Sequence, residues 1–256
     1  ASFETTDDEN DTDQLGSSTV TVTVCAGDDL TVSKTMEEFY TRTWTWSIDK
    51  YLAEGEVAKK YGAPGDSLSF NYGVTVDATT ADSDWYITGT ITVSNPSDWQ
   101  DVVLDSLVDE VPGGTCVLVD AEGEPLVEPV FTVPMSSSID VDYICTFAEA
   151  PGYTGLVNTA TATWNATTYN TPTDTASDTK DVVFGDPTTM IDESIDVVDS
   201  AAGSLGPVTY ADTLPYSFTT YSNSWAAVAG ICKDYDNTAS FETTDDENDT
   251  DQLGSS

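Results

Sequence analysis

Apolar and polar residues alternate along most of the chain, and this pattern predicts β-strands. In residues 41–52 the side chains of Trp44, Trp46 and Ile48 fall two residues apart, so they share one face of an expected strand. Further strands are expected at residues 30–35, 67–79, 84–96, 101–109, 115–120, 129–134, 139–147, 156–164 and 176–184, separated by turns rich in Gly, Pro, Asn and Asp. No stretch shows a convincing helical period. Many short strands at roughly ten-residue spacing predict an all-β sandwich fold.

A domain boundary is expected at Gly185, Asp186 and Pro187, where turn-forming residues interrupt the strand pattern. Residues 26–185 then form the first domain, and residues 186–256 form a second with about four or five strands, near the low end of what one sandwich needs. The two parts resemble each other locally, because Asn-Thr-Ala opens a strand at residues 158–160 and again at residues 237–239. This parallel predicts two related sandwich domains.

An 18-residue sequence, ASFETTDDENDTDQLGSS, occurs twice, as residues 1–18 and as residues 239–256. Such a self-match is the signature of a repeat. The first copy leads into a strictly alternating segment made of Thr19, Val20, Thr21, Val22, Thr23 and Val24. If residues 240–243 are one arm of a hairpin, this segment is its expected second arm. Residues 1–25 are therefore interpreted as a donor segment that completes the second domain of a neighbouring unit by β-strand addition and covers its sheet edge.

Another interpretation of the duplication is that it reflects only how the chain is delimited. In that case the duplication does not indicate how units assemble, whereas the predicted fold is unchanged. The strand that follows the first copy is the feature on which the two interpretations differ.

The chain of 256 residues is strongly acidic, with 46 Asp and Glu against 7 Lys and Arg and a net charge of −39. Such a charge repels nucleic acids and anionic membrane surfaces, so neither is an expected partner. A hydrophobic content of 39% is typical of a folded protein. No segment predicts a membrane span or a signal peptide, so membrane insertion is not expected here and an export signal would lie outside this segment.

Four cysteines and the absence of histidine constrain the chemistry. Zinc and iron–sulfur sites are not expected, and two disulfides are favoured over free buried thiols. Cys116 and Cys145 lie in two expected strands of the first domain, and a bond between them would close a span of about 29 residues. Cys25 ends the alternating segment and Cys232 precedes the residues 237–243 strand, so these two would lie close together if the strands pair. That second bond would be intermolecular if the strands belong to separate chains.

Other candidate sites are weaker. Asp7 to Asp13 could bind Ca²⁺ through several carboxylates, or form a solvated loop, and no other cofactor is expected. Asn10, Asn165 and Asn248 begin Asn-x-Thr sequences that accept N-linked glycans, although such triplets also arise by chance in a Thr-rich chain. Without histidine or a nucleophile motif, no catalytic residue is assigned and enzymatic activity is not expected.

Several segments together resemble a widespread family of secreted bacterial surface proteins built from tandem immunoglobulin-like β-sandwich repeats. They are LTVSKTMEEFYTRTWTWSIDK, APGDSLSFNYGVTVDATTADSDWYITGTITVSNPSDW, GGTCVLV, DYICTF and NTATATW, and they cover most of residues 20–185. The resemblance implies immunoglobulin-like domains and an extracellular or cell-surface location. Some similar proteins form fibrils by passing strands between subunits. The expected function is therefore a structural repeat or subunit of a filament or surface stalk, and the alternative is a carbohydrate- or calcium-dependent adhesin module.

Overall fold

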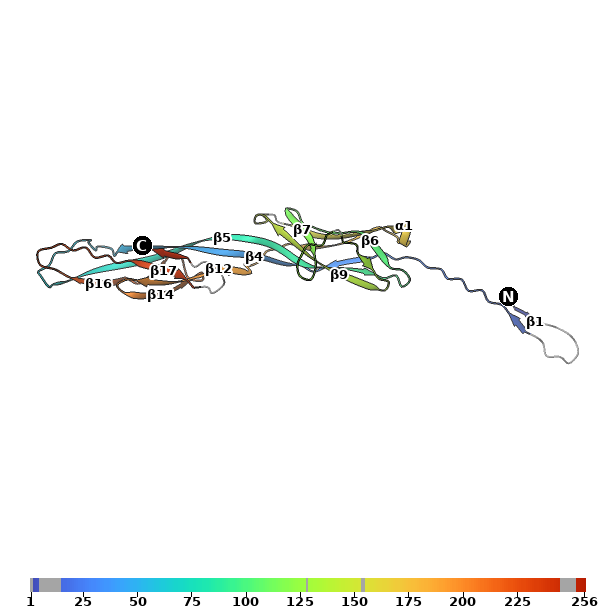
Figure 1. Ribbon diagram of the computed structural model, residues 1–256, viewed down its shortest axis with the longest axis horizontal. Helices are drawn as coiled ribbons and strands as arrows, with labels where there is room; N and C mark the ends of the chain where they lie inside the picture. The colour runs from blue at the N-terminus through green and yellow to red at the C-terminus, as the bar shows by residue number, and fades with distance from the viewer. Residues whose placement is uncertain (1, 5–14, 128, 153–154, 245–251) are drawn as a thin grey trace.

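The structure is a computed structural model that describes residues 2–4, 15–127, 129–152, 155–244 and 252–256. It is an elongated, all-β molecule, with the N-terminal hairpin at one end and the strand β16 (Tyr221–Ala226) near the other (Figure 1). The one described helix, α1 (Ala166–Tyr169), is a single turn. The predicted all-β class is thus confirmed. The acidic loop Asp7 to Asp13 and the sequons at Asn10 and Asn248 lie outside the described residues.

Two sheets pack around the first hydrophobic core. One contains, in order, β11 (Thr175–Asp181), β10 (Val157–Trp164), β6 (Val102–Glu110) and β8 (Thr132–Val133). The facing sheet contains β3 (Thr31–Lys34), β5 (Ser67–Asn95), β9 (Ser137–Phe147) and β7 (Gly114–Val119). Burial alternates along β10, where Ala160, Ala162 and Trp164 point inward, as the two-residue period requires. Tyr143, Ile87 and Trp164 are among the largest fully buried side chains of this core.

A second core is enclosed by the other half of the long strands. β4 (Glu37–Leu52) and the first half of β5 lie with β15 (Tyr216–Ser217) and β16 on one side. The facing sheet contains β14 (Gly203–Thr209), β13 (Ser194–Asp199), β17 (Ala239–Thr243) and β18 (Leu253–Ser255). Trp44, Trp46 and Phe241 are buried here, and Ile48 packs against them. The prediction that Trp44, Trp46 and Ile48 share a core-facing side is confirmed.

The long strands correct the predicted domain boundaries. Val74 and Val76 of β5 belong to the second core, whereas Ile87 and Ile91 of the same strand belong to the first. The expected break after residue 79 is absent, because residues 79–83 contain no Gly or Pro and pair with residues 41–45 of β4. The second sandwich is therefore not made from residues 186–256 alone. It is completed by β4 and β5 of its own chain.

The duplicated sequence forms the same hairpin twice. In the first copy β1 (Ser2–Glu4) pairs with β2 (Leu15–Ser17), and in the second copy β17 pairs with β18 in the same register of the repeated sequence. The predicted second arm was therefore wrong: residues 240–243 pair with residues 253–255 and not with a segment like 19–24. In the second copy Phe241 is buried against Gly254, where an added Cβ would lie 2.1 Å from the ring. That hairpin is a built part of the second sandwich.

Candidate assembly site

The segment that follows the first hairpin is exposed. Val20, Val22 and Val24 are 83%, 79% and 89% exposed, although three apolar side chains on one face of a strand are usually buried. Residues 19–24 pair with no strand among the described residues, and they lie on the arm that joins β2 to β3 (Figure 1). The alternating segment is thus present as an apolar face that its own chain leaves uncovered.

The second hairpin indicates the direction in which a segment that follows it would run. The Gln252 amide nitrogen donates to the Trp44 carbonyl (2.7 Å), and the Ser256 Oγ accepts from the backbone N–H of Lys50 (3.2 Å). Gln252 contacts Trp44, and Ser256, four residues later, contacts Lys50 further along β4. The last residues of the hairpin and β4 therefore run in the same direction. A chain continuing from Ser256 in this direction would pass the end of β4 at Leu52. Residues 19–25 are the ones that follow the first copy of the hairpin sequence.

A groove lies beyond the end of β4. We call it the distal groove; it has a volume of about 280 Å³ and is lined by residues 58–62, 225–228 and 231–235 together with Leu68 and Phe70. Aromatic rings form much of its wall: Trp225 contacts Phe70 edge to face at 5.8 Å and lies 5.5 Å from Tyr235. Ile231 on its rim is 59% exposed. The groove therefore combines exposed apolar surface with a shape that can accept a chain segment.

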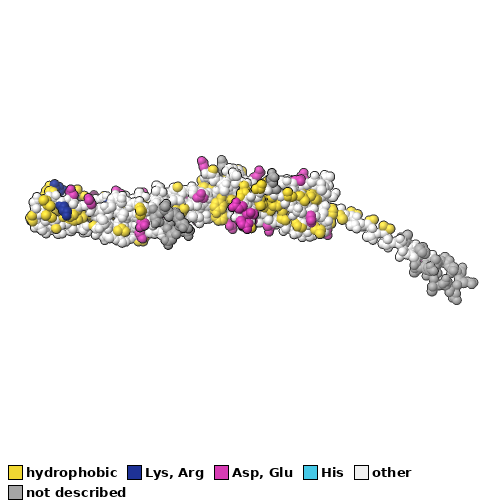
Figure 2. Space-filling view, viewed as in Figure 1, with side chains coloured by type: hydrophobic (Ala, Val, Ile, Leu, Met, Phe, Trp, Pro, Cys, Tyr) yellow, Lys and Arg dark blue, Asp and Glu magenta, His cyan; other side chains and the backbone are white. Residues whose placement is uncertain are grey.

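The distal groove also carries a local positive charge. Three lysines, Lys59, Lys60 and Lys233, line it together with one acid, Asp234, and they are three of the seven basic residues of the chain. Figure 2 shows the Lys and Arg side chains of the visible face gathered at this end, with acidic side chains beside them and along the rest of the molecule. Lys60 pairs with Glu56 at 2.6 Å and, with backbone N–H groups, holds the pKa of Glu56 at about 2. Against a net charge of −39, this end is the one most compatible with an acidic partner segment.

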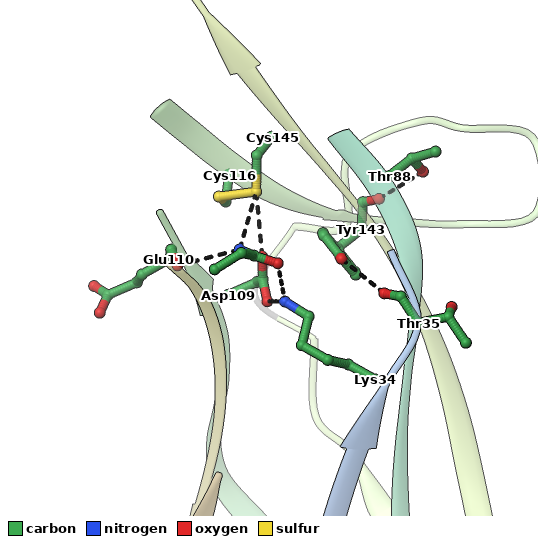
Figure 3. The surroundings of a disulfide bond; sticks show 9 residues. Lys34, Thr35, Thr88, Asp109, Glu110, Cys116, Tyr143 and Cys145 are labelled. Atoms are coloured by element: carbon green, nitrogen blue, oxygen red, sulfur yellow. Dashed lines mark hydrogen bonds and ion pairs between the residues drawn. A yellow bond between two sulfur atoms is a disulfide. The ribbon is translucent and has the colours of Figure 1, made fainter. Parts of the chain in front are cut away.

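The cysteines divide into two kinds. Cys116 and Cys145 face each other across β7 and β9 and form a disulfide, as predicted (Figure 3). Cys25 and Cys232 are free and exposed. They are not joined within one chain, because Cys25 follows the exposed arm and Cys232 lines the distal groove at the other end of the molecule (Figure 1). A bond between Cys25 and Cys232 thus stays a prediction for two different units.

The remaining candidate residues are placed as follows. Asn165 is exposed and caps α1, its side chain accepting from the Thr168 N–H at 2.8 Å. Asp109 lies within 4.8 Å of both sulfurs of the Cys116–Cys145 pair, but bonded sulfurs do not provide the thiolates that bind metals. Among the described residues, no helix is long and apolar enough to cross a membrane.

Sequence reasoning missed two sets of polar residues inside the sandwiches, the first fully buried and the second partly buried. Each contains a lysine, an aspartate and an asparagine: Lys34, Asp109 and Asn158 in the first sandwich, and Lys50, Asp199 and Asn237 in the second. The available signal was the repeated Asn-Thr-Ala, whose asparagines are Asn158 and Asn237. No motif connects these asparagines with a lysine far away in the chain.

Comparison with known proteins assigns no family. Neither a search against protein-family models nor one against curated proteins finds a match for this chain.

Proposed function

We propose that this chain is a structural unit of an extracellular filament or cell-surface stalk, and that its units join head to tail by β-strand addition. The observation that carries the proposal is the repeated hairpin. One copy is packed into the second sandwich, while the other is followed by three exposed valines that need a partner surface.

The proposed junction follows from equating the two hairpins. A chain that continues from β18 of the preceding unit, as the first hairpin continues into residues 19–25, would pass Leu52 and enter the distal groove. Six extended residues span about 20 Å. The valine face would be covered by the apolar wall of the groove, and Cys25 would approach Cys232. In one polypeptide β17 and β18 themselves would continue into this segment, whereas the hairpin of a separate chain would have to replace β17 and β18 of the preceding unit.

The charges at the two ends favour the same arrangement. Asp28 and Asp29 follow Cys25 closely, and the groove that would receive this segment holds Lys59, Lys60 and Lys233. Opposite charges at a junction direct the correct ends together and disfavour contact between like ends. Immunoglobulin-like domains and an oxidising location, where disulfides such as Cys116–Cys145 persist, belong to this proposal.

Deletion of residues 19–24 tests the proposal. The intact chain is expected to form end-to-end assemblies by negative-stain microscopy and light scattering, and the deleted chain is expected to remain as single units. A matched control replaces Thr19, Thr21 and Thr23 by serine, which changes the opposite face of the segment and should leave assembly intact. Intact assemblies from the deleted chain would refute strand addition.

The same experiment separates the proposal from the adhesin alternative. An adhesin module is expected to remain monomeric and to bind Ca²⁺ or a glycan saturably in calorimetry. An intact-mass measurement of material from the native source, after reduction, distinguishes separate units of about 27 kDa from one long polypeptide. Excess mass on the peptide that contains Asn165 would report a glycan there.

A further inference from the structure

Three polar side chains meet inside the first sandwich. Lys34 on β3, Asp109 on β6 and Asn158 on β10 are 4%, 7% and 0% exposed. The Lys34 Nζ contacts both Asp109 Oδ1 and the amide oxygen of Asn158, while the Asn158 amide nitrogen donates to Asp109 Oδ2. The three residues therefore touch one another in pairs, with the amine beside the amide carbonyl.

Apolar and aromatic groups enclose this set. The ring of Tyr143 lies 4.2 Å from the Lys34 Nζ, and the Cys145 Sγ lies 3.2 Å from Asp109 Oδ2. Figure 3 shows Lys34 reaching toward Asp109 from the facing sheet, next to the Cys116–Cys145 disulfide. A fully buried ion pair is costly because two charges lose their hydration. Burial lowers the pKa of the Lys34 amine and raises the pKa of the Asp109 carboxyl. Both directions favour an uncharged amine beside an uncharged acid.

The second sandwich repeats the arrangement. Lys50 on β4 contacts Asp199 on β13. With its amide oriented to satisfy its neighbours, Asn237 accepts from the Lys50 Nζ at 3.0 Å and donates to Asp199 Oδ1 at 2.9 Å. The rings of Tyr72 and Tyr221 lie 4.7 and 5.0 Å from that Nζ.

The strand register shows that the two sets are equivalent. In the first sandwich Asp109 pairs across the sheet with Ala160, the third residue of Asn-Thr-Ala. In the second sandwich Asp199 pairs with Ala239, the third residue of the other Asn-Thr-Ala. Each asparagine therefore lies two residues before the residue that pairs with its aspartate. Two unrelated ion pairs would not be expected to share this register.

We propose that each sandwich closes an isopeptide bond between its lysine and its asparagine: Lys34 to Asn158 in the first and Lys50 to Asn237 in the second. The Lys34 ammonium gives a proton to the Asp109 carboxylate, and the neutral Nζ attacks the side-chain carbonyl carbon of Asn158. A C–N bond forms as the carbonyl becomes tetrahedral, and its oxygen is stabilised by the Asp109 acid.

The collapse of this intermediate completes the reaction. The bond to the original amide nitrogen breaks. This –NH2 group takes one proton from the attacking amine and one from Asp109, so it leaves as ammonium. The ammonium ion carries away the positive charge that Lys34 held at the start, and Asp109 is again a carboxylate. The step needs no oxidant, cofactor or second substrate. Asp109 contacts both reacting groups and is the catalytic residue of this reaction.

The second site differs in its acid. Burial alone would raise the pKa of Asp199, but hydrogen bonds from Lys50, Tyr221 and two backbone N–H groups lower it. Asp199 therefore accepts the proton of Lys50 less readily than Asp109 accepts that of Lys34. The Lys50 to Asn237 bond is expected to form more slowly than the first.

High-resolution mass spectrometry of the reduced, intact chain tests the proposal independently of assembly. Each bond removes one ammonia, so the mass is expected to fall by about 17 Da for one bond and about 34 Da for both. Digestion with an acid-specific protease should then yield branched peptides that contain residues 34 and 158, or residues 50 and 237. A time course after refolding should show the first pair before the second.

Variants assign the chemistry. Asp109→Ala should retain one ammonia, so the mass is about 17 Da higher, and should give residues 34 and 158 on separate linear peptides, whereas Asp199→Ala should have this effect only for residues 50 and 237. Because a buried Ala variant could fail to fold, the branched peptides of the unaltered chain are the deciding measurement. Separate linear peptides carrying Lys34 and Asn158 at full mass would overturn the proposal for that site, and the same applies to the second. A loss of about 18 Da, which corresponds to water, would place the bond on the aspartate and overturn the assignment to asparagine.

Discussion

The docking of the alternating segment can be measured within one molecule. In the proposed junction, the segment continues from the position of Ser256. A variant in which Ser256 is followed by a second copy of residues 19–25 should therefore fold this tail into its own distal groove. The tail carries Ser in place of its Cys, and Cys25 is also changed to Ser, so that only noncovalent docking is measured. The matched variant replaces the three valines of the tail by threonines, which keeps β-branching and strand propensity.

The expected difference follows from burial alone. Ordering the backbone costs the same in both tails and the same backbone hydrogen bonds form, so these terms cancel. Each substitution exchanges one buried methyl group for a hydroxyl; the lost methyl burial is worth about 0.8 kcal/mol, so three valines account for at least about 2.4 kcal/mol. This corresponds to a roughly 50-fold change in the ratio of docked to free tail.

The assay is the rate at which a maleimide modifies Cys232, which lines the groove and is exposed in the unextended chain. The valine tail should slow this modification, and the threonine tail should slow it far less. A third tail with serine at the three original threonine positions should protect Cys232 as well as the valine tail does. Equal modification rates for the unextended chain and the valine tail would refute docking in the distal groove.

Three further outcomes are expected. Assemblies formed under oxidising conditions should show chains linked by disulfides on non-reducing gels, and Cys25→Ser should abolish the ladder; an unchanged ladder would exclude Cys25. Replacing Cys116 and Cys145 by alanine should lower the free energy of unfolding by about 3–4 kcal/mol in urea denaturation, since their bond closes a span of 29 residues; an unchanged midpoint would contradict this. Arg42 binds Asp82 at 2.7 and 2.8 Å and lowers its pKa, so this stabilisation is complete above the unfolded pKa of Asp82 and is lost as the pH falls through its lower folded value. Because the pair is on the surface, Asp82→Asn should remove less than about 1 kcal/mol at neutral pH and nothing in strong acid, and an equal effect at both pH values would contradict the assignment.

The sequence predicted local features well. Alternation identified most strands and the inward face of Trp44 and Trp46, because burial on one side of a strand leaves a two-residue period. The spacing of two strand-borne cysteines led to the Cys116–Cys145 bond. These features depend on neighbours in the chain, or on side chains whose chemistry limits their partners.

The sequence did not predict which residues meet across the molecule. Nothing local shows that β5 continues through residue 80 into another sandwich, since the deciding contacts are with β4 and β16. The pairing of Lys34 with Asn158 spans 124 positions and depends on two sheets packing face to face. The repeated Asn-Thr-Ala marked one member of each set, but its lysine had no corresponding motif.

The continuation of β5 through both sandwiches, with one register shift near Asp84, determines how this molecule responds to bending. Its 29 residues correspond to about 95 Å of extended chain, paired along much of that length with β4. Two sandwiches joined by a flexible linker can pivot, whereas here a pivot would have to break ladder hydrogen bonds between β4 and β5. The unit should therefore behave as a stiff rod, and the curvature of any string of such units would be concentrated at the junctions between them.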